Sequence, residues 1–139
     1  AGIYRGFVSL YKRGKTSVIP KMIAASSTQK NPIIQSFKLG LSHCEDLDPK
    51  SIKETKYNEP LINWHSFDGD EALYAIAESK GRAYHISDKN MKEMTSFLLK
   101  KEGYRVLPAS TAGLIGVLRM HEEEVMEEGR IVAVLTAKY

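Results

Sequence analysis

The chain has 139 residues, of which 42% are hydrophobic and 27% are charged, and its formal net charge is +3. These proportions are typical of a globular domain and exclude a fibrous or disordered chain. The longest stretch without a charged side chain, residues 106–118, is shorter than the roughly 20 residues that a membrane-spanning helix needs. We therefore expect residues 1–139 to form a single domain that does not enter a membrane.

The first third of the chain predicts a helix, a strand and a second helix. Apolar residues recur every three or four positions over residues 3–13, which is the spacing of an amphipathic helix. The short apolar run at 18–25 predicts a buried strand. Asn31 and Pro32 then cap a helix that ends near Gly40.

The middle of the chain predicts two further helices and a strand. Asp48 and Pro49 form a cap and first turn that open a short helix. Residues 70–79 follow the helical pattern, with Gly81 as the stop. The run at 82–86 predicts the strand that follows directly.

The last third predicts two helices that alternate with two strands. Ser87 caps a helix that ends at Gly103, and residues 104–107 form the next strand. A long helix covers 110–127, and a β-branched strand covers 131–136.

Such alternation of strand and helix implies right-handed crossovers and a mostly parallel sheet with helices on both faces. The sequence therefore predicts an α/β fold with three αβα layers. Because parallel sheets bind ligands beyond the carboxyl ends of their strands, the residues that follow each strand are candidate site residues.

Two hydroxyl residues lie at such positions. Ser110 belongs to a helix start of small residues, where free N–H groups could bind an anion or a polar ring substituent. Alternatively, Ser110 only caps the helix, while Ala112 and Gly113 allow close packing on the sheet. Thr136 ends the last strand and shares an edge with Ser110 in the expected topology. Its hydroxyl could bind a heteroaromatic nitrogen or satisfy local backbone groups.

Other polar groups predict no further site. His43, Cys44 and Glu45 are adjacent in sequence, but adjacent side chains rarely reach one ion, so we expect no metal site. The remaining histidines, His65, His85 and His121, lack the spacing of a zinc helix or a nucleophile partner.

Charge and cysteine content bear on partners and location. Residues 1–44 hold seven Lys or Arg and no acidic residue, a charge that could attract nucleic acid, an acidic partner domain or a phosphorylated ligand. Without a recognised module or an aromatic stacking pattern, we expect no nucleic-acid binding. The single Cys44 and the absence of an apolar leader predict a cytoplasmic protein. Because the chain opens on Ala1 without methionine, we interpret it as a fragment.

Two segments near the end of the chain resemble one enzyme family. The segment GYRVLPASTAGL at 103–114 is followed by GRIVAVLT at 129–136. Tryptophan-synthase-β-like, pyridoxal-phosphate-dependent enzymes of fold type II carry EGI..EPASAAALAGL and then VLTG in the same order. Weaker matches at 1–7, 31–40 and 60–64 agree. The chain is most similar to the threonine-synthase-like members of this family.

The resemblance implies the C-terminal part of a cofactor-binding large domain whose upstream half is absent. In the family, the Schiff-base lysine, an asparagine loop and the phosphate-binding glycines lie upstream of the segment that Ala1 begins. Lys38 does not supply that lysine, because Leu39-Gly40 follows it where the family has Asp-Arg. We interpret Lys38 as an exposed helix lysine. The chain is therefore expected to hold no catalytic residue and to need the missing N-terminal half as a partner.

The implied activity is that of a pyridoxal-phosphate-dependent lyase in threonine biosynthesis, which converts O-phosphohomoserine to threonine and phosphate. The family is usually dimeric, so a homodimer is a possible assembly. We expect the isolated chain to be inactive. Two alternatives stay open: a related fold type II enzyme, such as a cysteate synthase or an ammonia-lyase-like protein, and a non-catalytic binding or regulatory module.

Applied residue by residue, the resemblance implies that two residues bind the cofactor. It places Thr136 opposite the pyridine nitrogen of pyridoxal phosphate and Ser110 beside the cofactor. Two positions depart from the family pattern: Leu107 stands where the family has glutamate, and Ala137 stands where a glycine follows the threonine. Because of these departures, the resemblance does not identify the substrate.

Overall fold

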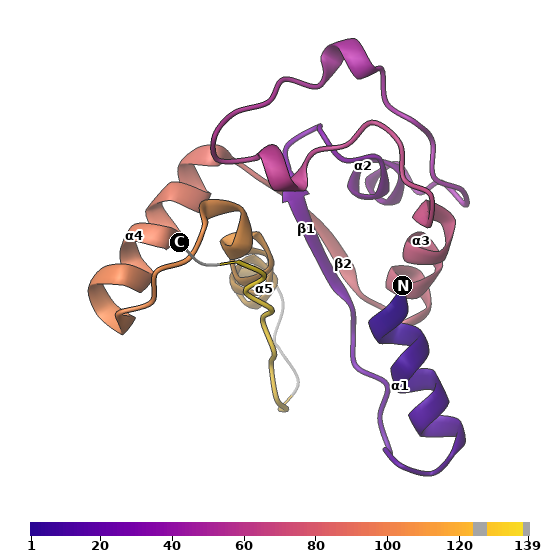
Figure 1. The fold of residues 1–139 in the computed structure, drawn as a ribbon. Helices are drawn as coiled ribbons and strands as arrows, with labels where there is room; N and C mark the ends of the chain where they lie inside the picture. Colours follow the sequence, from indigo (N-terminus) through magenta and orange to yellow (C-terminus); the bar gives the residue numbers. More distant parts are fainter. Residues whose placement is uncertain (124–127, 138–139) are drawn as a thin grey trace.

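A computed structural model describes residues 1–123 and 128–137. Two parallel strands form its centre: β1 (Ile23–Ser27) pairs with β2 (Arg82–Ile86), with Ile23 opposite Arg82. Helix α5 (Ala112–Glu123) covers one face of this sheet, and α2 (Pro32–Lys38) and α3 (Gly69–Glu78) cover the other (Figure 1). The predicted α/β fold, its three layers and its parallel strand pairing are confirmed.

The two remaining α-helices lie at opposite ends of the molecule (Figure 1). Helix α1 (Gly2–Lys12) lies beside α3, where Tyr4 meets Tyr74 edge to face and Arg5 pairs with Glu71 at 3.2 Å. Helix α4 (Asp88–Glu102) lies beyond α5. In the described part of the chain, no helix is long and apolar enough to cross a membrane.

Capping side chains fix the helix starts that the sequence predicts. Asn31 Oδ1 accepts hydrogen bonds from the backbone N–H groups of Ile33 and Ile34, at 3.1 and 3.3 Å. Ser87 Oγ accepts the N–H of Asn90 at 3.2 Å. Asp48 caps in the same way, but the helix that follows is one short 3-10 turn, η1 (Pro49–Ser51). A second 3-10 turn, η2 (Glu59–Leu61), precedes α3.

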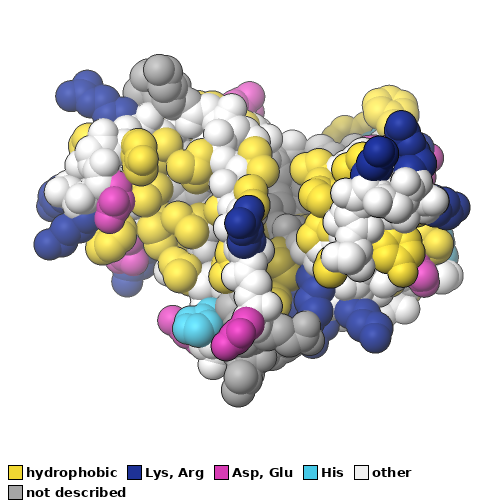
Figure 2. All heavy atoms as spheres, turned by 90° about the horizontal axis from the view of Figure 1, so that it is seen from below, with side chains coloured by type: hydrophobic (Ala, Val, Ile, Leu, Met, Phe, Trp, Pro, Cys, Tyr) yellow, Lys and Arg dark blue, Asp and Glu magenta, His cyan; other side chains and the backbone are white. Residues whose placement is uncertain are grey.

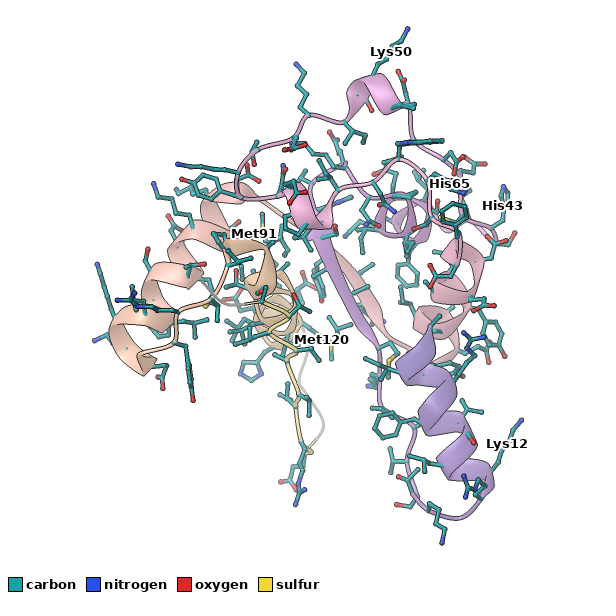
Figure 3. All side chains as sticks on the ribbon, in the orientation of Figure 1. Lys12, His43, Lys50, His65, Met91 and Met120 are labelled. Atoms are coloured by element: carbon teal, nitrogen blue, oxygen red, sulfur yellow. The ribbon has the colours of Figure 1, made fainter. Side chains whose placement is uncertain are left out.

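The core fills the space between the sheet, α4 and α5. Met91 of α4 and Met120 of α5 point into it from two sides (Figure 3). Gly116 lets α5 approach the sheet, since a Cβ there would lie 3.1 Å from the Cβ of Ala25. The expectation that Gly113 provides this close packing is wrong, because a Cβ on Gly113 would meet nothing within 4 Å.

Two of the predicted strands are absent from the described residues. Residues 104–107 and 131–136 are extended, but neither segment pairs with β1 or β2. A run of β-branched residues is typical of a strand whose side chains pack on a pleated, half-buried sheet. Without a neighbouring strand, such a run forms no ladder of hydrogen bonds. The run at 131–136 therefore leaves its apolar side chains exposed, namely Ile131, Val132, Val134 and Leu135.

Two other predicted elements have different bounds. Strand β1 begins at Ile23 rather than residue 18, because Pro20 has no N–H to donate to a ladder. The long helix predicted at 110–127 begins as a 3-10 turn, η3 (Pro108–Thr111), before α5. Its predicted end at residue 127 lies outside the described residues.

Candidate functional site

The turn η3 lies at the carboxyl end of the sheet. It packs against η2, which Ser26 of β1 holds through a 2.7 Å hydrogen bond from Ser26 Oγ to the Leu61 carbonyl. It also packs against α4, the helix that follows β2. In Figure 1, η3 is the orange turn that leads into α5, close to the arrowhead of β1. This is the edge at which an α/β sheet binds ligands.

Ser110 and Thr136 meet at this edge. Their hydroxyl oxygens are 3.3 Å apart, although 26 residues separate them in the sequence. Ser110 is 4% exposed, whereas Thr136 is exposed. The expected proximity of the two residues is therefore present, even though the strand that was expected to bring Thr136 there does not form.

The backbone of Ala137 completes the contact. Its N–H donates to Ser110 Oγ at 2.8 Å, and its carbonyl accepts from Ser110 Oγ at 3.0 Å and from the Leu107 N–H at 3.2 Å. Ser110 does not cap α5, which begins two residues later, so the capping alternative is wrong. The two departures from the family pattern, Leu107 and Ala137, are thus hydrogen-bonded to each other. No sequence signal predicts this bond, because backbone groups form it.

Two lysines of the basic N-terminal segment lie on helices outside the turn η3. Lys12 lies at the far end of α1, on the opposite side of the molecule from η3 (Figure 3). Lys38 is exposed on α2, as interpreted from the sequence, and its Nζ lies 5.9 Å from the Tyr84 ring centroid.

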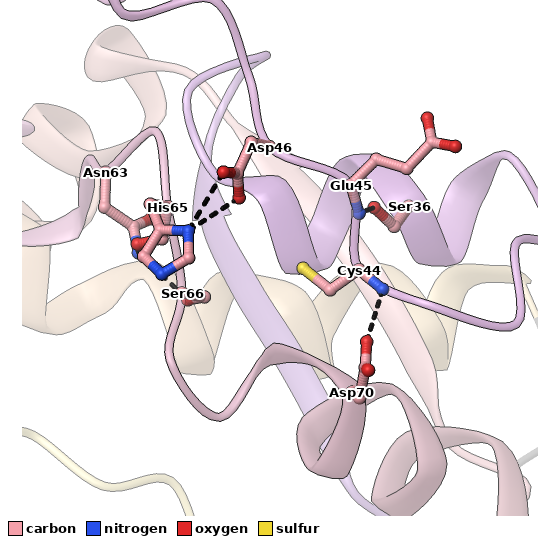
Figure 4. A network of polar contacts seen from close by, with 8 residues as sticks. All are labelled: Ser36, Cys44, Glu45, Asp46, Asn63, His65, Ser66 and Asp70. Atoms are coloured by element: carbon pink, nitrogen blue, oxygen red, sulfur yellow. Dashed lines mark hydrogen bonds and ion pairs between the residues drawn. The ribbon is translucent and has the colours of Figure 1, made fainter.

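A second polar cluster joins the loops around α2 and α3 (Figure 4). The His65 Nδ1 lies 2.8 Å from Asp46 Oδ1, and the Cys44 N–H donates to Asp70 at 2.6 Å. Burial raises the pKa of the Cys44 thiol, and nearby carboxylates raise it further. A hydrogen bond with Ser36 lowers this pKa but does not cancel the rise. The thiol is therefore kept protonated and is a poor nucleophile. The sequence did not predict the pairing of His65 with Asp46.

The same loops carry His43, which pairs with Glu45 at 3.3 Å (Figure 3). Among the described residues, no group of three or more His, Cys, Asp or Glu side chains is placed to hold a metal ion.

His85, at the end of β2, bonds to the loop that follows β1. Its Nδ1 accepts the backbone N–H of Gln29 at 3.3 Å, and Gln29 has a left-handed φ of 56°. Burial lowers the pKa of His85, and the positive charge of Lys38 lowers it further. A backbone hydrogen bond at Ser27 opposes these two effects, but the net direction is a lowered pKa, which together with the bond from Gln29 favours the neutral ring.

We expect the stability of the chain to fall as the pH drops below about 6.5, the pKa of an unperturbed histidine. The unfolded state then takes up a proton on His85 more readily than the folded state, whose His85 pKa is lowered. The stability that His85 contributes is complete at pH values above its pKa in the unfolded chain. This stability is lost as the pH falls toward its lower pKa in the folded chain. Urea unfolding at several pH values measures this, and His85→Gln should flatten the slope. An unchanged slope in His85→Gln would contradict the assignment.

Comparison with known proteins places this chain in a family. The model of the family described as "Pyridoxal-phosphate dependent enzyme" matches residues 1–137. The chain belongs to this family. The relatives that it matches include proteins named threonine synthase, at 28% identity over 98% of the chain in Methanocaldococcus jannaschii and 29% over 96% in Synechocystis sp.. The threonine synthase of Methanosarcina acetivorans is 28% identical over 96% of the chain. The chain spans about a third of the length of these relatives, between 31% and 33%.

The donor set at the edge fits one side of the family's cofactor. Pyridoxal phosphate presents a ring nitrogen, and a neutral hydroxyl such as that of Thr136 can donate to it or accept from it. The four residues of this contact, namely Leu107, Ser110, Thr136 and Ala137, carry no amine and no cationic side chain that would hold the aldehyde or the phosphate. The edge is thus suited to the ring-nitrogen side of the cofactor.

Proposed function

We propose that this chain forms the C-terminal part of a threonine-synthase-like enzyme, which converts O-phosphohomoserine to threonine and phosphate with pyridoxal phosphate. The observation that carries the proposal is the Ser110–Thr136 contact of 3.3 Å at the carboxyl edge of a parallel sheet. It supports the proposal because it places the two hydroxyls named by the family resemblance side by side. The relatives named threonine synthase support the choice of reaction within the family.

In this proposal, the chain binds the cofactor's ring but provides no catalytic residue. Thr136 holds the ring nitrogen through its hydroxyl, and Ser110 lies beside it. When bound, pyridoxal phosphate withdraws electrons from the amino-acid substrate. In this proposal, the missing N-terminal half of the cofactor-binding domain provides the lysine that anchors the cofactor and the loop that binds its phosphate. A cytoplasmic location and a homodimer belong to the same proposal.

We expect the 139-residue chain alone to release no phosphate from O-phosphohomoserine, even with added pyridoxal phosphate. The contacts that remain are neutral hydrogen bonds worth about 1 kcal/mol each, which cannot replace a covalent anchor. A phosphate-release assay measures this. The comparison is the longer protein that is expressed when the upstream coding DNA is included. Turnover by the chain alone would contradict the proposal.

The upstream coding DNA separates the alternatives. A lysine-containing segment, an asparagine loop and a glycine-rich loop upstream of Ala1 would support the enzyme. Substrate profiling of the longer protein would then distinguish a threonine synthase from a cysteate synthase or an ammonia-lyase-like protein. A start codon directly before Ala1 would instead support a non-catalytic binding or regulatory module.

A further inference from the structure

The extended segment 131–137 is hydrogen-bonded to the rest of the described chain at one place. Within the described residues, every hydrogen bond between this segment and the remainder joins Thr136 or Ala137 to Leu107 or Ser110. Most of its side chains are exposed, and on the underside of the molecule hydrophobic side chains gather on both sides of a hollow (Figure 2). The backbone next to Thr136 is therefore held by these polar contacts and not by a strand ladder.

Ser110 provides most of these contacts with a single hydroxyl. A serine hydroxyl has one proton to donate and two lone pairs with which to accept. Ser110 Oγ accepts the Ala137 N–H at 2.8 Å and donates its proton toward the Ala137 carbonyl at 3.0 Å. The second lone pair faces Thr136 Oγ1 at 3.3 Å. Ser110 is also only 4% exposed. Its hydroxyl therefore has no hydrogen-bonding capacity left for a ligand.

We propose that Ser110 is a positioning residue: it holds the backbone of Ala137 and thereby places the hydroxyl of Thr136, and it does not bind the cofactor itself. This proposal rests on the proposed function for the identity of the ligand. It differs from the role that the resemblance gives to Ser110, that of a second cofactor contact. Thr136 is exposed, and after its proton is donated to Ser110 Oγ its oxygen keeps two lone pairs that can accept a hydrogen bond from a protonated ring nitrogen.

The first test measures the attachment itself in the 139-residue chain. Ser110→Ala should make the Ala137 amide exchange with solvent about tenfold faster, because the N–H loses its acceptor. Ser110→Thr restores a hydroxyl and should slow the exchange again. Ala137→Pro, which removes the N–H from the other side, should release the segment while Ser110 is intact. Limited proteolysis after Arg130 provides the readout for that variant.

Thr111→Val is the matched control. Thr111 is buried in the same turn, but its hydroxyl donates to the Pro108 carbonyl at 2.7 Å and does not contact Ala137. We expect this variant to destabilise the chain and to speed the exchange of Ala137 much less than Ser110→Ala does, because the acceptor of the Ala137 N–H stays in place. Equal acceleration in Ser110→Ala and Thr111→Val would overturn the proposal, since the effect would then be general loosening. No acceleration in Ser110→Ala would overturn it directly.

The second test asks whether Ser110 acts through Thr136. In the protein that carries the cofactor lysine, the dissociation constant of pyridoxal phosphate is read from its absorbance in Ser110→Ala, Thr136→Val and the double variant. We expect Ser110→Ala to weaken binding several-fold, and to add little once Thr136 is valine. An equal loss in both backgrounds would mean that Ser110 touches the cofactor, against the proposal. Faster exchange of Ala137 with unchanged cofactor binding in all three variants would contradict the proposed function and leave the attachment by Ser110 standing.

Discussion

Replacing Gly81 by alanine is expected to destabilise the chain by about 4 kcal/mol, because the new methyl group has no room. A Cβ at this position would lie 1.9 Å from the carbonyl oxygen of Met22 and 2.8 Å from its carbonyl carbon. Both are backbone atoms, so a side-chain rotation cannot relieve the overlap. The carbonyl of Met22 also accepts the N–H of Arg82 at 3.2 Å, which is the first bond of the β1–β2 ladder. Moving that carbonyl breaks the ladder where it begins.

Gly113→Ala is the matched control, because it adds the same methyl group to a glycine with nothing within 4 Å of the new atom. Gly113 lies in the first turn of α5, where alanine is preferred over glycine by roughly 0.5–1 kcal/mol. We expect this variant to be slightly more stable than the parent chain. Urea unfolding of the three proteins measures the difference. A Gly81→Ala chain as stable as Gly113→Ala would show that the close approach of Met22 is not required.

Gly81 also illustrates what sequence patterns can predict. The sequence correctly indicates that the helix before β2 ends near this glycine, since α3 ends at Glu78. The left-handed φ of 55° at the end of this helix belongs to Lys80, the residue before Gly81. A helix stop is a local property and can be read from neighbouring residues. The contact with Met22 joins residues 59 positions apart and cannot.

Elements that carry their own caps were predicted well. Helix α2 follows Asn31, whose side chain satisfies two free N–H groups, and α4 follows Ser87 in the same way. Strand β2 has the predicted bounds, Arg82–Ile86, because helices cover both faces of the sheet and a neighbouring strand pairs with it. Where the requirement for a structure lies within a few residues, the sequence indicates it.

The segment 131–136 shows the limit. Its β-branched residues indicate a strand, yet strand formation depends on a partner that the segment itself does not contain. Its place at the candidate site comes instead from the backbone of Ala137, which any residue except proline would provide in the same form. The sequence could therefore indicate Ser110 and Thr136 as candidates through their positions after predicted strands and through a resemblance, but it could not show what holds them together.

The second large effect is expected for Met91→Ala, which should destabilise the chain by about 3 kcal/mol. The Met91 side chain is fully buried between the sheet and α5, in contact with the cluster that contains Ile86 and Ile115. Alanine keeps the propensity for helix and leaves a cavity that the close-packed surroundings cannot fill. For a chain of this size, the loss corresponds to a melting temperature lower by about 10 °C.

This substitution also reaches the candidate site, because α4 packs against η3 and the Met91 carbonyl lies 3.5 Å from the hydroxyl of Thr111. Loosening α4 should therefore loosen the turn that carries Ser110 and speed the exchange of the Ala137 amide together with that of the core. Leu99→Ala, on the same helix but 46% exposed, provides the control and should cost less than about 1 kcal/mol. Thermal unfolding compares the two variants, and equal melting temperatures would contradict the central place of Met91 in the core. Ser110→Ala is expected to release Ala137 and to leave the core intact, whereas Met91→Ala is expected to weaken both. The pair of variants therefore separates local attachment from global stability.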